Sequence, residues 1–198
     1  MKFSKLAALA RREKMMVLAS TWRDDLIIRQ HLQVGSGIYP LDGMPVMDKD
    51  ELLVALDVQP DKKHEYAVFE EELSGDAAIM AEDNPSEKPD EYAELKLLRL
   101  DTGITTRVIV ETPWGIRFVN ADYVDVLKGE KGVEWFARDM GSGRVALVGK
   151  RGYQTIASIG TSDAWIDEQN CELLSQAVER MKAVVAERKK RDGEQQRI

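Results

Sequence analysis

Apolar positions along the chain follow two periodicities, and the changes between them divide it into short elements. Helical spacing over residues 3–13 predicts a first helix. Asp48 followed by Glu51 has the spacing of a capping box and predicts a second over 48–57, and Asn120 is a good N-cap for a third over 121–128. Short apolar or β-branched runs between turn residues predict strands at 15–21, 26–33, 37–41, 65–70, 76–81, 92–100, 104–111, 115–119, 133–138, 144–149 and 154–159.

The last predicted element is a long helix. Residues 163–190 contain neither Gly nor Pro, and one apolar stripe recurs there at spacings of four, three and four: Leu174, Val178, Met181 and Val185. Such a stripe either packs on the protein's own sheet or pairs with another helix, so these four residues are candidates for an oligomer interface.

The order of these elements favours an α+β fold, in which short helices alternate with antiparallel meanders. The Pro-containing stretch 84–91 reads as a linker or loop. We therefore expect an N-terminal subdomain over 1–83, a second over 92–162, the long helix over 163–192 and a disordered tail over 193–198.

Charge changes this picture in only one respect. The chain has 198 residues and a net charge of -7, which disfavours a simple basic nucleic-acid binder. The charge is uneven, however: residues 1–14 carry +4, residues 61–101 carry −8, and residues 179–197 carry +3. The bulk value therefore excludes little, and nucleic acid remains a candidate partner.

Candidate chemistry is sparse. One cysteine and two histidines offer no disulfide framework and no clear metal set, and no nucleophile, base and stabiliser stand in a recognisable pattern. His31 is expected to face solvent from a strand, and Lys150 to lie in a solvated hairpin turn. The sequence predicts no enzyme, no catalytic, cofactor or metal site, no small-molecule substrate, and no signal peptide or membrane helix, hence a cytoplasmic protein.

In the segment 115–160 a predicted strand leads through Asn120 into a short helix with Tyr123 and Leu127 toward the sheet, and a meander of VEWFAR, RVALVG and TIASIG follows. In this order of elements the segment resembles part of the DNA sliding clamp family. The resemblance implies a clamp-like fold of two subdomains and, for a ring of such chains, a closed trimer. The compact mixture of small elements is also typical of bacteriophage or prophage proteins.

Two functions follow as alternatives. The first is a DNA replication accessory or processivity-like factor, with seven candidate DNA-binding residues: Lys5, Arg11, Arg12, Arg188, Lys189, Lys190 and Arg191. The second is a protein-interaction or phage assembly module that self-associates, as a dimer or trimer, through its C-terminal helix without binding DNA. The predicted helices 48–57 and 121–128 argue against the first, because they are rich in acidic residues that would repel DNA.

Overall fold

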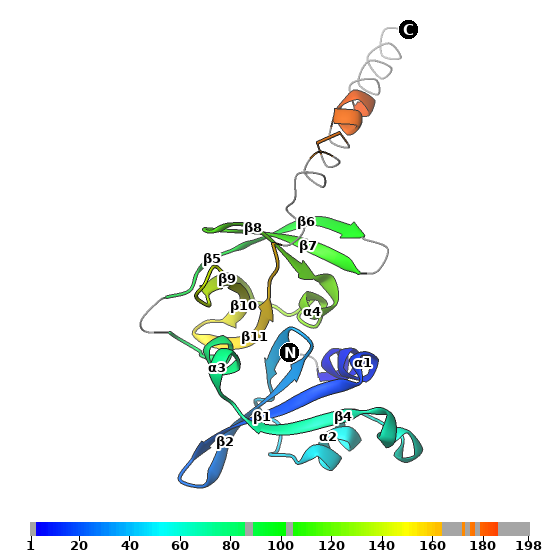
Figure 1. The fold of residues 1–198 in the computed structure, drawn as a ribbon, viewed down its shortest axis with the longest axis vertical. Coiled ribbons are helices and arrows are strands. Elements are labelled where there is room, and N and C mark those ends of the chain that lie inside the picture. The colour runs from blue at the N-terminus through cyan, green and yellow to red at the C-terminus, as the bar shows by residue number, and fades with distance from the viewer. Residues whose placement is uncertain are drawn as a thin grey trace. The chain divides into compact units, whose positions relative to one another are not determined.

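The computed structural model of the chain describes residues 3–85, 89–101, 105–163 and, toward the C-terminus, 172, 175, 176 and 179–185. It divides into two units, residues 1–162 and 163–198. The first unit contains all the named helices and strands (Figure 1). Its helices are α1 (Phe3–Glu13), α2 (Lys49–Ala55), the 3-10 helix η1 (Pro60–Glu65), α3 (Gly75–Ala81) and α4 (Ala121–Asp125).

The described strands form two sheets. Their bounds are β1 (Met15–Arg23), β2 (Leu26–Val34), β3 (Gly37–Pro40), β4 (Ala67–Glu72), β5 (Glu91–Tyr92), β6 (Glu94–Asp101), β7 (Thr106–Thr112), β8 (Gly115–Asn120), β9 (Glu134–Asp139), β10 (Val145–Arg151) and β11 (Gln154–Gly160). The larger sheet has the order β4-β1-β2-β3-β11-β10-β9-β5, and the smaller has the order β6-β7-β8. All pairs are antiparallel except β1 with β4, so the α+β class with short helices is confirmed and the larger sheet is mixed.

Within residues 1–162, the larger sheet joins two segments of the same element order, which we call the α-β-β-β units. One consists of α1-β1-β2-β3 and the other of α4-β9-β10-β11. They meet where β3 and β11 pair, with Ile38 opposite Ser158 and Gly37 opposite Ile159. The eight strands therefore take in residues from both halves of the chain, and α1 contacts α4.

The apolar core lies between this sheet and the helices α1, α2 and α4. Leu6, Leu18, Leu32, Leu52 and Leu147 are fully or almost fully buried in one cluster. Tyr39 is also fully buried there, and its hydroxyl donates to the carbonyl of Tyr123, a bond of 2.9 Å that ties β3 to α4. The opposite face of the sheet is covered at its centre by α3, which contacts β3 and β11 (Figure 1).

The local signals at the helix starts are confirmed. Asp48 accepts from the backbone N–H groups of Asp50 and Glu51, each at 2.9 Å, and Glu51 reaches back to the N–H of Asp48. Asn120 accepts from the N–H of Asp122 at 3.0 Å. The third helix is shorter than predicted, since α4 ends at Asp125.

One element was predicted with the wrong type. Residues 76–81 form most of helix α3, not a strand. The reason is tertiary: Arg138 donates to the carbonyls of Ile79, Met80 and Glu82 at the end of this helix. A seven-residue helix is marginal in isolation, so capture of its carbonyls by a side chain from another element favours it over a strand.

The predicted helix 163–190 lies mostly outside the described residues. Residues 172, 175, 176 and 179–185 are helical. No helix among the described residues is long and apolar enough to span a membrane.

Candidate functional site

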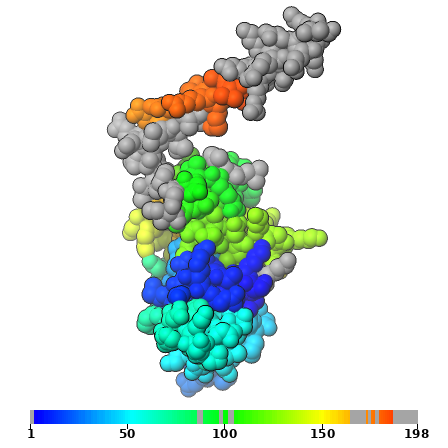
Figure 2. Space-filling model, turned by 90° about the vertical axis from the view of Figure 1, so that its right-hand side faces the viewer, coloured from blue at the N-terminus to red at the C-terminus, as the bar shows by residue number. Residues whose placement is uncertain are grey.

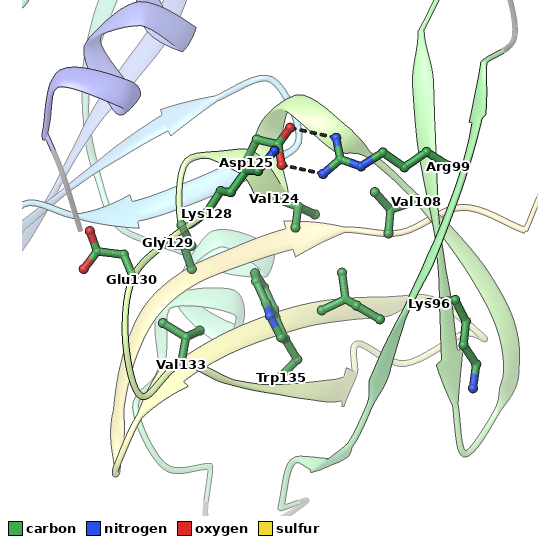
Figure 3. Close-up of a pocket in the computed structure, with 12 residues that line it drawn as sticks. Lys96, Arg99, Val108, Val124, Asp125, Lys128, Gly129, Glu130, Val133 and Trp135 are labelled. Carbon is green, nitrogen blue, oxygen red and sulfur yellow. Dashed lines mark hydrogen bonds and ion pairs between the residues drawn. The ribbon is translucent and has the colours of Figure 1, made fainter.

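A pocket of about 310 Å³ opens between the smaller sheet and the second α-β-β-β unit (Figure 3). Trp135 of β9 forms its apolar wall, with Val108 of β7 and Val124 of α4 nearby. Gly149 makes room for this wall, because a Cβ there would lie 3.1 Å from the indole of Trp135 and 2.9 Å from Leu127. The missing side chain on β10 thus leaves space for Trp135 and Leu127, two of the residues that line the pocket.

An ion pair spans the pocket from β6 to α4. Both terminal nitrogens of Arg99 donate hydrogen bonds to the carboxylate of Asp125, at 2.6 and 2.8 Å (Figure 3). The hydrogen bond from Arg99 holds the pKa of Asp125 below its usual value, and burial opposes that shift. Lys96 is likewise paired, with Glu94 and Glu111. The pocket can bind an apolar or aromatic group, but its lining contains no Ser, Cys or His to act as nucleophile or base.

Figure 2 shows α1, in dark blue, next to the cyan segment that contains α2. Of the three predicted DNA-binding cations of α1, Lys5 and Arg12 contact α4, and Arg11 contacts the end of α2. Lys5 donates to the carbonyls of Asp125 and Lys128 at the end of α4. Arg11 donates to the carbonyl of Leu56, which caps α2. Their positive charges therefore complement the C-terminal ends of two short helices, as cations commonly do.

Arg12 has the most exposed side chain of the three α1 cations. Its guanidinium lies 3.0 Å from Asp122 and 3.2 Å from Glu13, and half of its side chain is exposed. Burial would lower the pKa of Arg12, but the hydrogen bonds that its guanidinium donates to Asp122 and Glu13 raise it overall. Each α1 cation thus has a partner within the protein.

The other predicted site residues belong to the C-terminal unit. Arg188, Lys189, Lys190, Arg191, Leu174 and Val178 lie outside the described residues. Met181 and Val185 are helical and exposed, at 58% and 51%.

A buried charge cluster was missed by sequence reasoning. Asp90 accepts from Arg138 through both carboxylate oxygens, each at 2.7 Å, and lies 2.6 Å from the ammonium of Lys150. The three side chains are 2%, 1% and 9% exposed. Burial would raise the pKa of Asp90, but its two cationic partners lower it overall. The expectation that Lys150 lies in a solvated turn is therefore wrong, because β10 continues through it as a buried strand residue.

The cluster fastens the segment after α3 to the sheet. Lys150 also donates to the carbonyl of Asp83, and the backbone N–H of Thr155 donates to the Asp83 carboxylate at 2.8 Å. Alternation of residue types along β9 and β10 gives no sign of this arrangement, because its partners come from a loop some fifty residues away in the chain. The arrangement holds structure together and exposes no reactive group.

His31 also contradicts its predicted position. It is 2% exposed rather than facing solvent, and neither of its ring nitrogens has a hydrogen-bond partner among the described residues. Burial, assisted by the charge of Arg29, lowers the pKa of His31 to about 4. Arg29 itself is fixed by Asp42 and Asp83, at 2.7 and 2.8 Å.

Among the described residues, no group of three or more His, Cys, Asp or Glu is arranged to hold a metal ion. The fold and these sites define an α+β protein in which the α1 cations and the cluster around Asp90 contact partners within the protein. No family model matches the chain, and no curated protein or solved structure is significantly similar to it.

Proposed function

We propose that this chain is a non-enzymatic, self-associating clamp-like protein that acts as an accessory factor in DNA replication. One observation carries the proposal: two units of order α-β-β-β join through β3 and β11 into one sheet, with α1 and α4 in contact. Two subdomains in one chain are what the clamp resemblance implies, and this repeated order supports the proposal. Because a fold alone does not determine function, DNA binding has to be tested separately.

A second candidate is favoured by the electrostatics of α1. Lys5, Arg11 and Arg12 all contact acceptors within the protein. A surface whose cations are already paired releases fewer counterions on contact with phosphate and so binds DNA weakly. This observation supports a protein-interaction or phage assembly module that associates without binding DNA.

Size-exclusion chromatography with light scattering, with and without duplex DNA at low and high salt, separates the two. The replication proposal predicts a trimer or another closed oligomer that co-elutes with DNA and releases it as salt rises. Replacing Arg12 by Gln should weaken this binding, whereas Arg23→Gln, at an exposed position on the β1–β2 hairpin, should not. A monomer or dimer indifferent to DNA at low salt contradicts the replication role.

Removal of residues 165–198 tests the second candidate. The remaining residues 1–162 contain every named helix and strand, so they are expected to stay folded. If the assembly module is correct, the shortened protein loses its self-association. An unchanged oligomeric state would show that the C-terminal residues are not the association element.

A further inference from the structure

An apolar groove runs beside α2 on the sheet face that α2 covers. It consists of two adjoining hollows of about 410 and 450 Å³, which share Val46, Met47 and Glu51 in their lining. We call it the α2 groove. Its apolar side chains are unusually open to solvent for groups of this size: Trp22 is 50% exposed, Val46 55% and Val54 67%. Apolar patches of this kind commonly mark interaction surfaces.

The wall of the groove is held in place before any partner binds. The buried side chain of Gln30 accepts from the backbone N–H of Met47 and donates to its carbonyl, both at 2.8 Å. These two bonds fix the segment between β3 and α2 against β2. Little conformational entropy is therefore lost on this side of the interface when a partner binds.

Charge in the first hollow of the groove is of one sign. This hollow is lined by five acidic residues and by no basic one: Asp48, Glu51, Glu70, Glu71 and Glu72. Asp48 and Glu51 are engaged in the capping box of α2. In the second hollow the basic residue Lys63 is paired with Asp50, at 3.3 Å.

The register of β4 shows which of its glutamates serve the groove. Glu72 lies opposite Ser20, which lines the groove, and Glu70 shares that face because side chains alternate along a strand. By the same alternation the side chain of Glu71 is directed to the other face, although Glu71 also lines the first hollow. Among the described residues, the side chains of Glu70 and Glu72 have no hydrogen bond or ion pair, which distinguishes them from the paired acids Asp42, Asp90 and Asp125.

We propose that the α2 groove binds a cationic amphipathic segment of a partner protein. Its apolar side chains would cover Trp22 and Val46, and its Lys or Arg side chains would pair with Glu70 and Glu72. Complementary charge favours this occupant over a second copy of the chain docked edge to edge, because β4 ends the larger sheet and two such edges would bring glutamates against glutamates. The proposal does not depend on ring formation or DNA binding.

The test uses the full chain and two fluorescently labelled synthetic peptides of lysine and leucine, one patterned as an amphipathic helix and one with strict alternation. Fluorescence anisotropy at low salt should show saturable binding of at least one peptide, weaker as salt rises. A peptide with glutamate in place of lysine should not bind. Absence of saturable binding by both lysine peptides would overturn the proposal.

Variants of one strand supply matched controls. Glu70→Gln and Glu72→Gln together should weaken peptide binding about tenfold or more, whereas Glu71→Gln, next to them but on the opposite face, should change it little. Trp22→Ala should also weaken binding, since it removes apolar contact area. Equal losses from Glu71→Gln and from its neighbours would indicate general attraction to an acidic protein and overturn the assignment to the groove.

Hydrogen exchange distinguishes a partner from a second copy. With peptide added, protection should rise at residues 44–47 and β4. If protection rose there with protein concentration alone, and the peptide failed to add to it, another copy of this chain would be the occupant and the partner proposal would be wrong.

Discussion

Acid should destabilise the protein through His31 before its carboxylates begin to titrate. An unfolded chain exposes the imidazole, whose pKa is then close to 6.5, whereas burial near Arg29 lowers the pKa of the folded group to about 4. The unfolded state therefore binds a proton first as pH falls. Stability associated with neutral His31 is complete above about pH 6.5 and is lost as pH falls toward 4.

The magnitude follows from the difference between the two pKa values. Linkage gives a loss of about 2 kcal/mol between roughly pH 7 and pH 5, and about 3 kcal/mol by pH 4. The carboxyl groups of Asp90, Asp42 and Glu65, whose pKa values are lowered in the folded protein, begin to contribute only as pH falls below about 5, where they take up protons in the unfolded chain. Between about pH 7 and pH 5 the loss therefore comes mainly from the histidine.

Urea unfolding followed by tryptophan fluorescence over this pH range measures the effect. His31→Leu should remove most of the slope and, since both ring nitrogens lack partners, should cost little stability at neutral pH. His64→Leu, at an exposed position in η1, is the matched control and should keep the slope of the original chain. The same acid sensitivity in His31→Leu as in the unaltered protein would refute the reasoning.

Two further changes probe the structure around the buried charges and the pocket. Asp90→Asn should cost about 3–5 kcal/mol in urea unfolding, since it leaves Arg138 and Lys150 buried without their anion; a loss below about 1 kcal/mol would contradict a buried cluster. Gly149→Val should cost about 1–3 kcal/mol and alter the fluorescence of Trp135, because its side chain would overlap the indole; unchanged stability and emission would show that the pocket wall yields freely.

Local sequence signals were sufficient where a few neighbouring residues decide the structure. The capping box at Asp48 and the cap at Asn120 satisfy backbone groups two or three residues away, so their spacing alone predicts α2 and α4. Helix α1 and strands β1 and β2 were predicted for the same reason, since their apolar faces repeat at regular intervals. Their existence is confirmed, with boundaries that differ by a few residues.

Sequence signals failed where distant residues decide. An apolar run at 76–81 fits a strand as well as a helix. The helix is favoured because Arg138, far along the chain, donates to the carbonyls of Ile79 and Met80. His31 and Lys150 are polar residues in strands, for which exposure is the usual expectation. Each is buried because the segment around α3 and its following loop covers the face of the sheet to which they belong.

The candidate sites divide in the same way. The cations of α1 were visible in the sequence, but only the folded chain shows that they contact carbonyls and carboxylates of α2 and α4. The α2 groove was not predicted from the sequence. Its apolar half comes from segments separated in sequence, and no periodicity links Trp22 to Val46.

By itself, the sequence determined the α+β class, the short capped helices and the uneven distribution of charge. These depend on interactions within a few residues, or on composition alone. Tertiary structure decided the joining of two α-β-β-β units through β3 and β11, the burial of Asp90 with its two cations, and which acids remain free to meet a partner. Such features depend on which distant segments become neighbours, and burial then sets whether a charge is solvated, paired or neutral.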